Sequence, residues 1–100
     1  MDSATLFKNT QIHIERFDDG DAVILDDEKQ FTHMLNITAL QIYDLCDGRS
    51  RDKTVEELLE MYREDIKKDS QIRMQIITDA NELIYELLEK GILYEKQNGT

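Results

Sequence analysis

Residues Leu35–Gly48 (LNITALQIYDLCDG) decide the fold, because they join a strand-like segment to a helix with no loop between them. The strand-like segment is Gln30–Met34 (QFTHM). Asn36 and Thr38 are both suitable N-cap residues, and Thr38-x-x-Gln41 has the spacing of a capping box. One apolar face follows at helical spacing, formed by Ile37, Leu40, Ile42, Leu45 and Cys46. These features predict a short helix that ends at Gly48 and fixes how the preceding strands meet the helices behind it.

Towards the N-terminus, alternating apolar residues predict two further strands, Gln11–Phe17 and Ala22–Leu25. Asp-Gly between them is a strong hairpin signal, and Asp26–Lys29 is a second polar turn. The third strand is Gln30–Leu35, with Phe31, His33 and Leu35 on one face and Gln30, Thr32 and Met34 on the other. Residues 1–10 show no clear period and are expected to form a flexible arm.

Towards the C-terminus, Thr54-Val55-Glu56-Glu57 has the pattern of a capping box that opens a second helix. A polar stretch, Arg63–Asp69, separates it from a third helix that begins at Ser70 or Gln71 and ends at Lys90, with Gly91 as its C-cap. Ile92–Tyr94 can form a last short strand or an extended tail, and residues 96–100 are expected to be flexible. The order predicts one α+β domain over residues 1–100, with an N-terminal three-stranded antiparallel sheet followed by three helices, in a small winged helix-turn-helix-like arrangement.

Composition narrows the class of protein. The chain has 100 residues, 40% of them hydrophobic, one cysteine and a net charge of −10. No apolar run is long enough for a membrane helix, and the first ten residues do not resemble a secretory signal, so we expect a cytoplasmic protein with no membrane partner. The negative charge opposes binding to phosphate backbones, so no nucleic-acid partner is expected.

No pattern typical of catalysis or of a metal or cofactor site is found. The aspartates of the two turns lack the spacing of a calcium loop. Cys46 lies on the apolar helix face, and His13 and His33 are too far apart in sequence to form a zinc set with it. We therefore expect no enzyme activity, no cofactor and no metal. The basic residues Lys67, Lys68 and Arg73 either form a solvated helix start or contact carboxylates of an acidic peptide.

The third helix has two adjoining apolar stripes. Ile72, Ile76, Leu83 and Leu87 form the first; Ile77, Ile84 and Leu88 form the second, with Ala80 between them. The combined arc is roughly 160°, wider than the ~100° that one core-facing side needs. Either both stripes are buried, or one closes the core and the other lines a groove. The second alternative predicts that Ile77 and Ile84 line a groove, beside the space left by Ala80, while Ile76 and Leu83 are core.

The ordered combination of these segments resembles the PqqD family, which supplies the recognition element for leader peptides of ribosomally made, modified peptides. The resemblance rests on Leu35-Asn36, Leu45-Cys46-Asp47-Gly48, Thr54–Leu59, Asp79-Ala80, Leu83, Leu87 and Gly91-Ile92-Leu93, and extends from Ile12 to Tyr94. Two features depart from the family pattern: Ala80, where a larger aliphatic residue is common, and the highly charged segment Arg63–Gln71.

The resemblance implies a non-catalytic protein that binds a precursor's leader peptide and presents the precursor to a modifying enzyme, often a radical-SAM maturase. The leader would pair as a strand with the open edge of Gln30–Met34 and place side chains against the third helix. The candidate peptide-binding residues are Gln30, Phe31, Thr32, His33, Met34, Arg73, Ile76, Ile77, Ala80 and Ile84. The alternative is a winged-helix transcription regulator that binds DNA.

Overall fold

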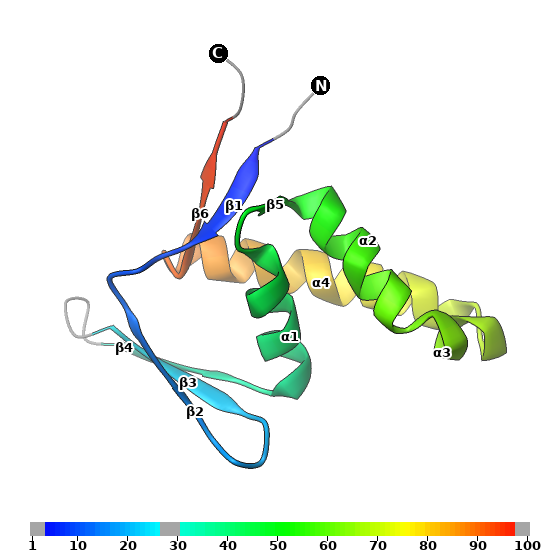
Figure 1. The fold of residues 1–100 in the computed structure, drawn as a ribbon, viewed down its shortest axis with the longest axis horizontal. Helices are drawn as coiled ribbons and strands as arrows, with labels where there is room; N and C mark the ends of the chain where they lie inside the picture. The colour runs from blue at the N-terminus through cyan, green and yellow to red at the C-terminus, as the bar shows by residue number, and fades with distance from the viewer. Residues whose placement is uncertain (1–3, 27–30, 98–100) are drawn as a thin grey trace.

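The computed structural model describes residues 4–26 and 31–97, which form two small sheets and a group of helices (Figure 1). The elements in chain order are β1 (Thr5–Lys8), β2 (His13–Arg16), β3 (Ala22–Asp26), β4 (Phe31–Leu35), α1 (Ile37–Cys46), β5 (Arg49–Ser50), α2 (Arg51–Met61), α3 (Arg63–Lys68), α4 (Gln71–Glu89) and β6 (Leu93–Lys96). The expected winged-helix-like α+β fold is confirmed, with one more sheet and one more helix than the sequence predicted.

The predicted three-stranded antiparallel sheet is present, in the order β2-β3-β4. In its first turn the Phe17 amide donates to the Asp21 carbonyl at 2.8 Å, and the Gly20 amide donates to the Phe17 carbonyl at 3.1 Å. Gly20 has φ +98°, and a Cβ there would lie 2.7 Å from Cγ1 of Ile37. Glycine is therefore needed both for this turn and for its close approach to α1. The second predicted turn falls largely on residues 27–30, outside the described residues.

A second sheet, in the order β5-β1-β6, joins the two ends of the domain. The expectation of a flexible N-terminal arm is wrong for Thr5–Lys8, because this segment pairs with both β5 and β6. Leu6 and Leu93 are 0% and 1% exposed, so the pairing also closes one side of the core. Figure 1 shows β1 and β6 side by side, away from the β2-β3-β4 sheet.

The helix caps agree with the sequence at α1 and differ at α2. Asn36 caps α1, its Oδ1 accepting from the Ala39 amide at 2.8 Å. The expected capping of the second helix by Thr54 is wrong: α2 begins at Arg51, with Ser50 Oγ accepting from the Lys53 amide. Thr54 lies one turn inside α2, fully buried, and its hydroxyl donates to the Ser50 carbonyl at 2.9 Å.

The polar stretch Arg63–Asp69, for which no separate helix was predicted, contains α3. This helix has no buried residue, and Glu64 and Asp65 in its first turn and Lys67 and Lys68 in its last complement its dipole. The third predicted helix is α4, followed by Gly91 at φ +76°, as expected. α4 runs behind α1 and α2 in Figure 1 and packs against both.

One hydrophobic core lies between the helices and the two sheets. Its members are Leu6, Ile24, Leu35, Ile42, Tyr43, Cys46, Leu58, Ala80, Ile84, Leu87, Ile92 and Leu93. Leu35 ends β4 and Ile42 belongs to α1, so the strand-to-helix junction enters this core directly. No helix within the described residues is long and apolar enough to span a membrane.

Candidate functional site

The outer edge of β4 is open along its length. Within the described residues β4 pairs with β3 alone, which leaves alternate backbone N–H and C=O groups of its other side without a strand partner. Side chains alternate as predicted, with Leu35 buried, His33 half-buried, and Thr32 and Met34 exposed. Such an edge can accept an extended peptide as a fourth strand.

α4 passes near the face of β4 that carries His33. His33 Nε2 is 3.7 Å from Glu86 Oε1, and the His33 side chain is 15% exposed. Glu86 belongs to a line of α4 residues at helical spacing that continues through Leu83, Glu82 and Asp79. A peptide added to β4 would therefore meet a face of α4 that is both apolar and acidic.

The two halves of α4 differ in burial. Ala80, Ile84 and Leu87 in the second half are fully buried. The isoleucines of the first half, Ile72, Ile76 and Ile77, are all only half-buried. The first half therefore has apolar surface that the core does not cover.

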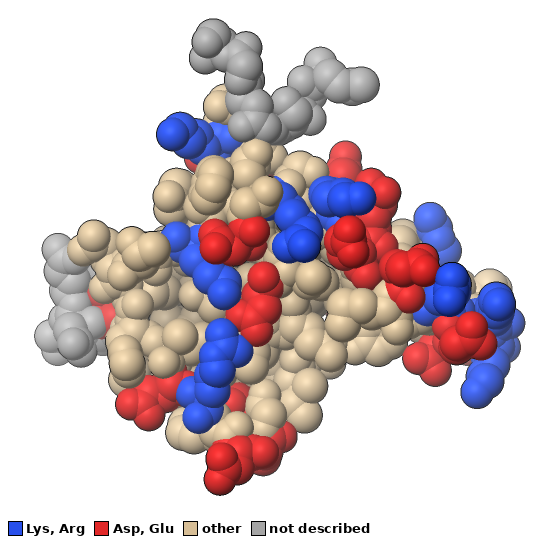
Figure 2. Space-filling model, in the orientation of Figure 1, with Lys and Arg blue, Asp and Glu red and all other residues tan. Residues whose placement is uncertain are grey.

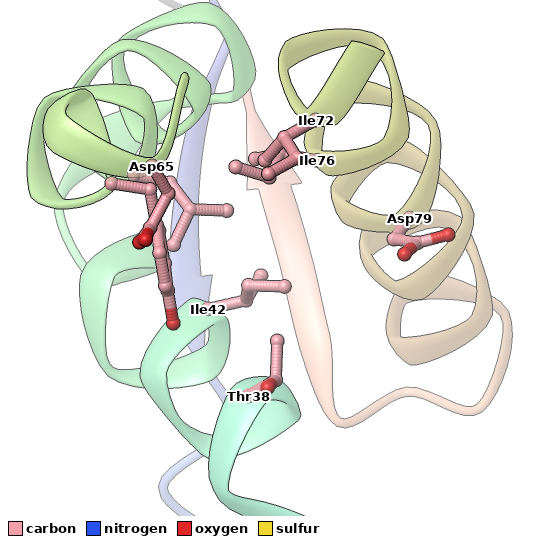
Figure 3. A pocket seen from close by; sticks show the side chains of 8 residues that line it. Thr38, Ile42, Asp65, Ile72, Ile76 and Asp79 are labelled. Atoms are coloured by element: carbon pink, nitrogen blue, oxygen red, sulfur yellow. The ribbon is translucent and has the colours of Figure 1, made fainter. Parts of the chain in front are cut away.

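A hollow of about 260 Å³ lies between α1, α2, α3 and the first half of α4; we call it the α1–α4 hollow. Ile72 and Ile76 point into it from α4, towards Ile42 of α1 (Figure 3). The remaining lining residues are Thr38, Leu58, Tyr62, Asp65 and Asp79. Tyr62 is held in place because its hydroxyl donates to Gln41 Oε1 at 2.6 Å. The space between the helices is thus an apolar recess with two carboxylates among its lining residues.

A second hollow of about 320 Å³ adjoins the first and shares Thr38, Ile42 and Asp79 with it. It is further lined by Asn36, Ala39 and Leu83. Asn36 directly follows the last residue of β4, so the two hollows form a continuous depression from the end of β4 to α3. This depression and the β4 edge make up the candidate site.

Some of the residues predicted to bind peptide lie at this candidate site in the structure. Thr32, His33 and Met34 lie in β4 with Phe31, whereas Gln30 is outside the described residues. Ile76 lines the α1–α4 hollow. Arg73 is exposed and lines neither hollow.

The assignment of the two α4 stripes needs correction. Ile84 and Ala80, expected at a groove, are each 0% exposed and belong to the core. Ile77 is half-buried and lines neither hollow. The recess is instead lined by Ile72, Ile76 and Leu83 of the stripe that was expected to be core. The main cause is position along α4: Ala80, Ile84 and Leu87 lie in the second half, which packs into the core, whereas Ile72 and Ile76 lie in the first half, which faces the hollow.

Sequence reasoning did not single out several residues that line the hollow, namely Thr38, Ile42, Tyr62, Asp65, Ile72 and Asp79. A partial signal existed in α4, where Ile72, Ile76, Asp79 and Leu83 follow each other at four-, three- and four-residue spacing. Tyr62 and Asp65 carried no such signal, because they flank a helix start that the charged sequence did not predict.

The side chains with a shifted pKa that could matter for reactivity, Cys46 and Asp44, line neither hollow. Cys46 is fully buried, and burial raises the pKa of its thiol to about 11, so it is a poor nucleophile. Asp44 accepts from Arg16 and Lys8 at 3.0 Å, and mainly the hydrogen bond from Arg16 lowers the pKa of its carboxyl. No group of three or more His, Cys, Asp or Glu side chains suited to a metal ion is present within the described residues.

The fold is similar to a chain of a solved structure described as "TbiB1 in Complex with the TbiA(beta) Leader Peptide". The TM-score is 0.66 and the sequence identity 18%, over 87% of this chain and 93% of that chain. The family profile described as "Coenzyme PQQ synthesis protein D (PqqD)" matches residues 21–93. The chain therefore belongs to the PqqD family. No curated protein matches the chain.

Proposed function

We propose that the protein is a non-catalytic recognition protein that binds the leader of a ribosomally made precursor peptide. The leader pairs as a strand with β4 and sets its side chains against α4. Membership of the PqqD family and the likeness to a chain solved with a leader peptide support this function. The observation that carries it is the open edge of β4 beside α4 and the apolar hollow that continues from its end.

The bound precursor is then available to a separate modifying enzyme, of which a radical-SAM maturase is the first candidate. The domain supplies binding and orientation only: backbone hydrogen bonds give affinity, and the alternate side chains of the leader give sequence preference. Action in the cytoplasm is part of this proposal and agrees with a single, buried cysteine.

The DNA-binding alternative is not favoured by charge. α4 carries Arg73 and Lys90 next to its end as basic residues, against Asp79, Glu82, Glu86 and Glu89. On the face shown in Figure 2, basic side chains are interspersed with acidic ones and form no continuous basic surface. Duplex binding depends largely on such a surface.

The test is calorimetric titration of the full chain with synthetic leaders of precursor peptides encoded near its gene. We expect one of them to bind with one-to-one stoichiometry and a scrambled version not to bind. A promoter fragment retarded tightly and sequence-dependently at physiological salt, with no leader bound, would overturn the proposal in favour of the DNA regulator.

A further inference from the structure

We propose that the α1–α4 hollow is the specificity pocket for a leader segment in which an apolar side chain stands next to a lysine or arginine. The proposal rests on the proposed function, because it assumes that the ligand is a peptide whose strand lies on β4. It adds the chemistry of the segment that follows the strand and the residues that select it.

The floor and walls of the hollow fit one apolar side chain. Ile42 and Leu58 are each 2% exposed and form a fixed base, whereas Ile72 and Ile76 are half-buried and keep apolar surface open to solvent. Pockets for drug-sized molecules hold roughly 300–1,000 Å³. The volume here is about 260 Å³, which suits a single leucine-, methionine- or phenylalanine-sized side chain better than a cofactor.

Two exposed carboxylates, Asp65 and Asp79, lie at the rim of the hollow, where they can meet a cation on the ligand. Asp65 and Asp79 lie on opposite sides of the hollow in Figure 3. In the described part of the chain, Asp79 accepts from Gln75 Nε2 of its own helix, at 3.0 and 3.2 Å. Among the described residues, no lysine or arginine is paired with either carboxylate, although Lys67 and Arg63 on α3 pair with Glu64 and Glu60. A ligand cation would therefore gain a charge-assisted hydrogen bond without displacing a basic partner, although at Asp79 it would share the carboxylate with Gln75.

The hollow is also placed where the leader strand would arrive. The neighbouring hollow begins at Asn36, immediately after β4, and shares Thr38, Ile42 and Asp79 with the α1–α4 hollow. A peptide extending from the edge of β4 past the start of α1 reaches Asp79 first and Asp65 last. This order places the apolar residue between two carboxylates, so a cationic residue directly beside it can reach one of them.

The same charges make this site reject an acidic segment. None of the described residues that line the hollow is basic, and Glu82 and Glu86 continue the negative line along α4 towards β4. A carboxylate on the ligand at this point would face like charges on one side of the depression. Specificity therefore comes from repulsion of acidic peptides as well as attraction of basic ones.

The experiment is selection of a displayed library of random 16-residue peptides on the immobilised full chain, followed by titration of the enriched peptides. We expect enriched peptides to share a β-prone stretch followed by an apolar residue next to Lys or Arg. In a tight binder, replacing that Lys or Arg by Gln should weaken binding about threefold at low salt, the scale of a partly exposed ion pair.

Protein variants assign the effect to the hollow. Asp65→Asn and Asp79→Asn keep side-chain size and should each remove the preference for Lys or Arg while leaving the apolar preference. Glu64→Gln and Glu89→Gln remove one exposed charge each from the same two helices outside the hollow, and should leave the preference unchanged. Ile76→Ser, with its fold checked by circular dichroism, should remove the apolar preference.

The outcomes separate this inference from the proposed function. If peptides are enriched and compete for the β4 edge, but lack the apolar–basic pair or ignore Asp65→Asn and Asp79→Asn, the pocket assignment is overturned and leader binding stands. A small molecule or a second copy of the chain that occupies the hollow in preference to peptide would also overturn it. Failure to enrich any peptide, or enrichment insensitive to changes in β4, would count against the proposed function itself.

Discussion

The two halves of α4 both carry several apolar residues but have different surroundings. In Ala80–Glu89, the residues Ala80, Ile84 and Leu87 are each 0% exposed. In Gln71–Asp79, no residue is fully buried, although three isoleucines lie there. The second half belongs to the core formed with both sheets, whereas the first half faces α3 and the open hollow beside α1. The elements opposite a helix decide its burial, and apolar surface left without a partner layer is available for a ligand.

The largest effect is expected in the buried half. Ile84→Glu places a charge in the core without a partner, which should cost on the order of 4 kcal/mol or more and unfold much of a domain of ordinary stability. Tyr85→Glu is the matched control, because Tyr85 is 63% exposed on the next position of the same helix. Thermal melting followed by circular dichroism compares them. Similar melting of the two variants would mean that this half of α4 is not core.

The next largest effect concerns the strand beside α4. Proline at Thr32 or at His33 removes one N–H donor, and successive donors of β4 point to opposite sides. One of the two variants should therefore stay folded and lose leader binding more than tenfold, while the other should lose stability through its bond to β3. Alanine at the same positions keeps the donor and is the control. Two folded proline variants that bind like wild type would refute strand addition at this edge.

A smaller effect is expected in the open half of α4. Ile76→Glu should keep the fold, because its side chain is already half-exposed to the hollow, and should weaken leader binding by more than ~1 kcal/mol, since a few anchor contacts dominate small interfaces. Ile77→Glu, one position on and lining neither hollow, should affect binding less. Titration of both variants measures the difference, and a larger loss at Ile77 would restore the assignment made from sequence alone.

The smallest effect concerns Asp44, on α1 away from the site. Arg16 and Lys8 lower the pKa of its carboxyl below the ordinary 3.8, so the ionised form is favoured by folding. The stability that this shift contributes is present above pH 3.8 and is lost as the pH falls through the lower, folded-state pKa. Asp44→Asn should therefore destabilise slightly at pH 7, in urea titrations, and the difference should shrink at about pH 2–3. A difference that persists unchanged in acid would show that the ion pair is not its cause.

The sequence predicted the elements whose signals are local. The Asp-Gly hairpin turn, the Asn36 cap and the limits of α4 each depend on neighbouring residues, and each is confirmed. The pairing of Thr5–Lys8 with Leu93–Lys96 could not be predicted, because the two strands are separated by almost the whole chain and residues 1–10 show no clear period.

For the candidate site, peptide binding at the β4 edge stays a prediction, whereas the assignment of Ala80 and Ile84 of α4 to a groove is wrong because both are fully buried. Two adjoining apolar stripes are equivalent on a helical wheel, and only the packing of α1 and the sheets shows that Ile84 is inside and Ile76 beside the hollow. The predicted start of α2 was wrong for a related reason. Ser50 and Thr54 are both good caps one turn apart, and burial of Thr54 in the core decides between them.

Amide hydrogen exchange, measured residue by residue with and without bound leader, tests the central claim most directly. In the free protein, alternate amides of Phe31–Leu35 on the outer side of β4 have no strand partner and should exchange quickly. We expect these amides to become protected when the leader binds, while the open edges of β2 and β6 remain unchanged. Protection at β2 or β6 with none at β4 would contradict the account.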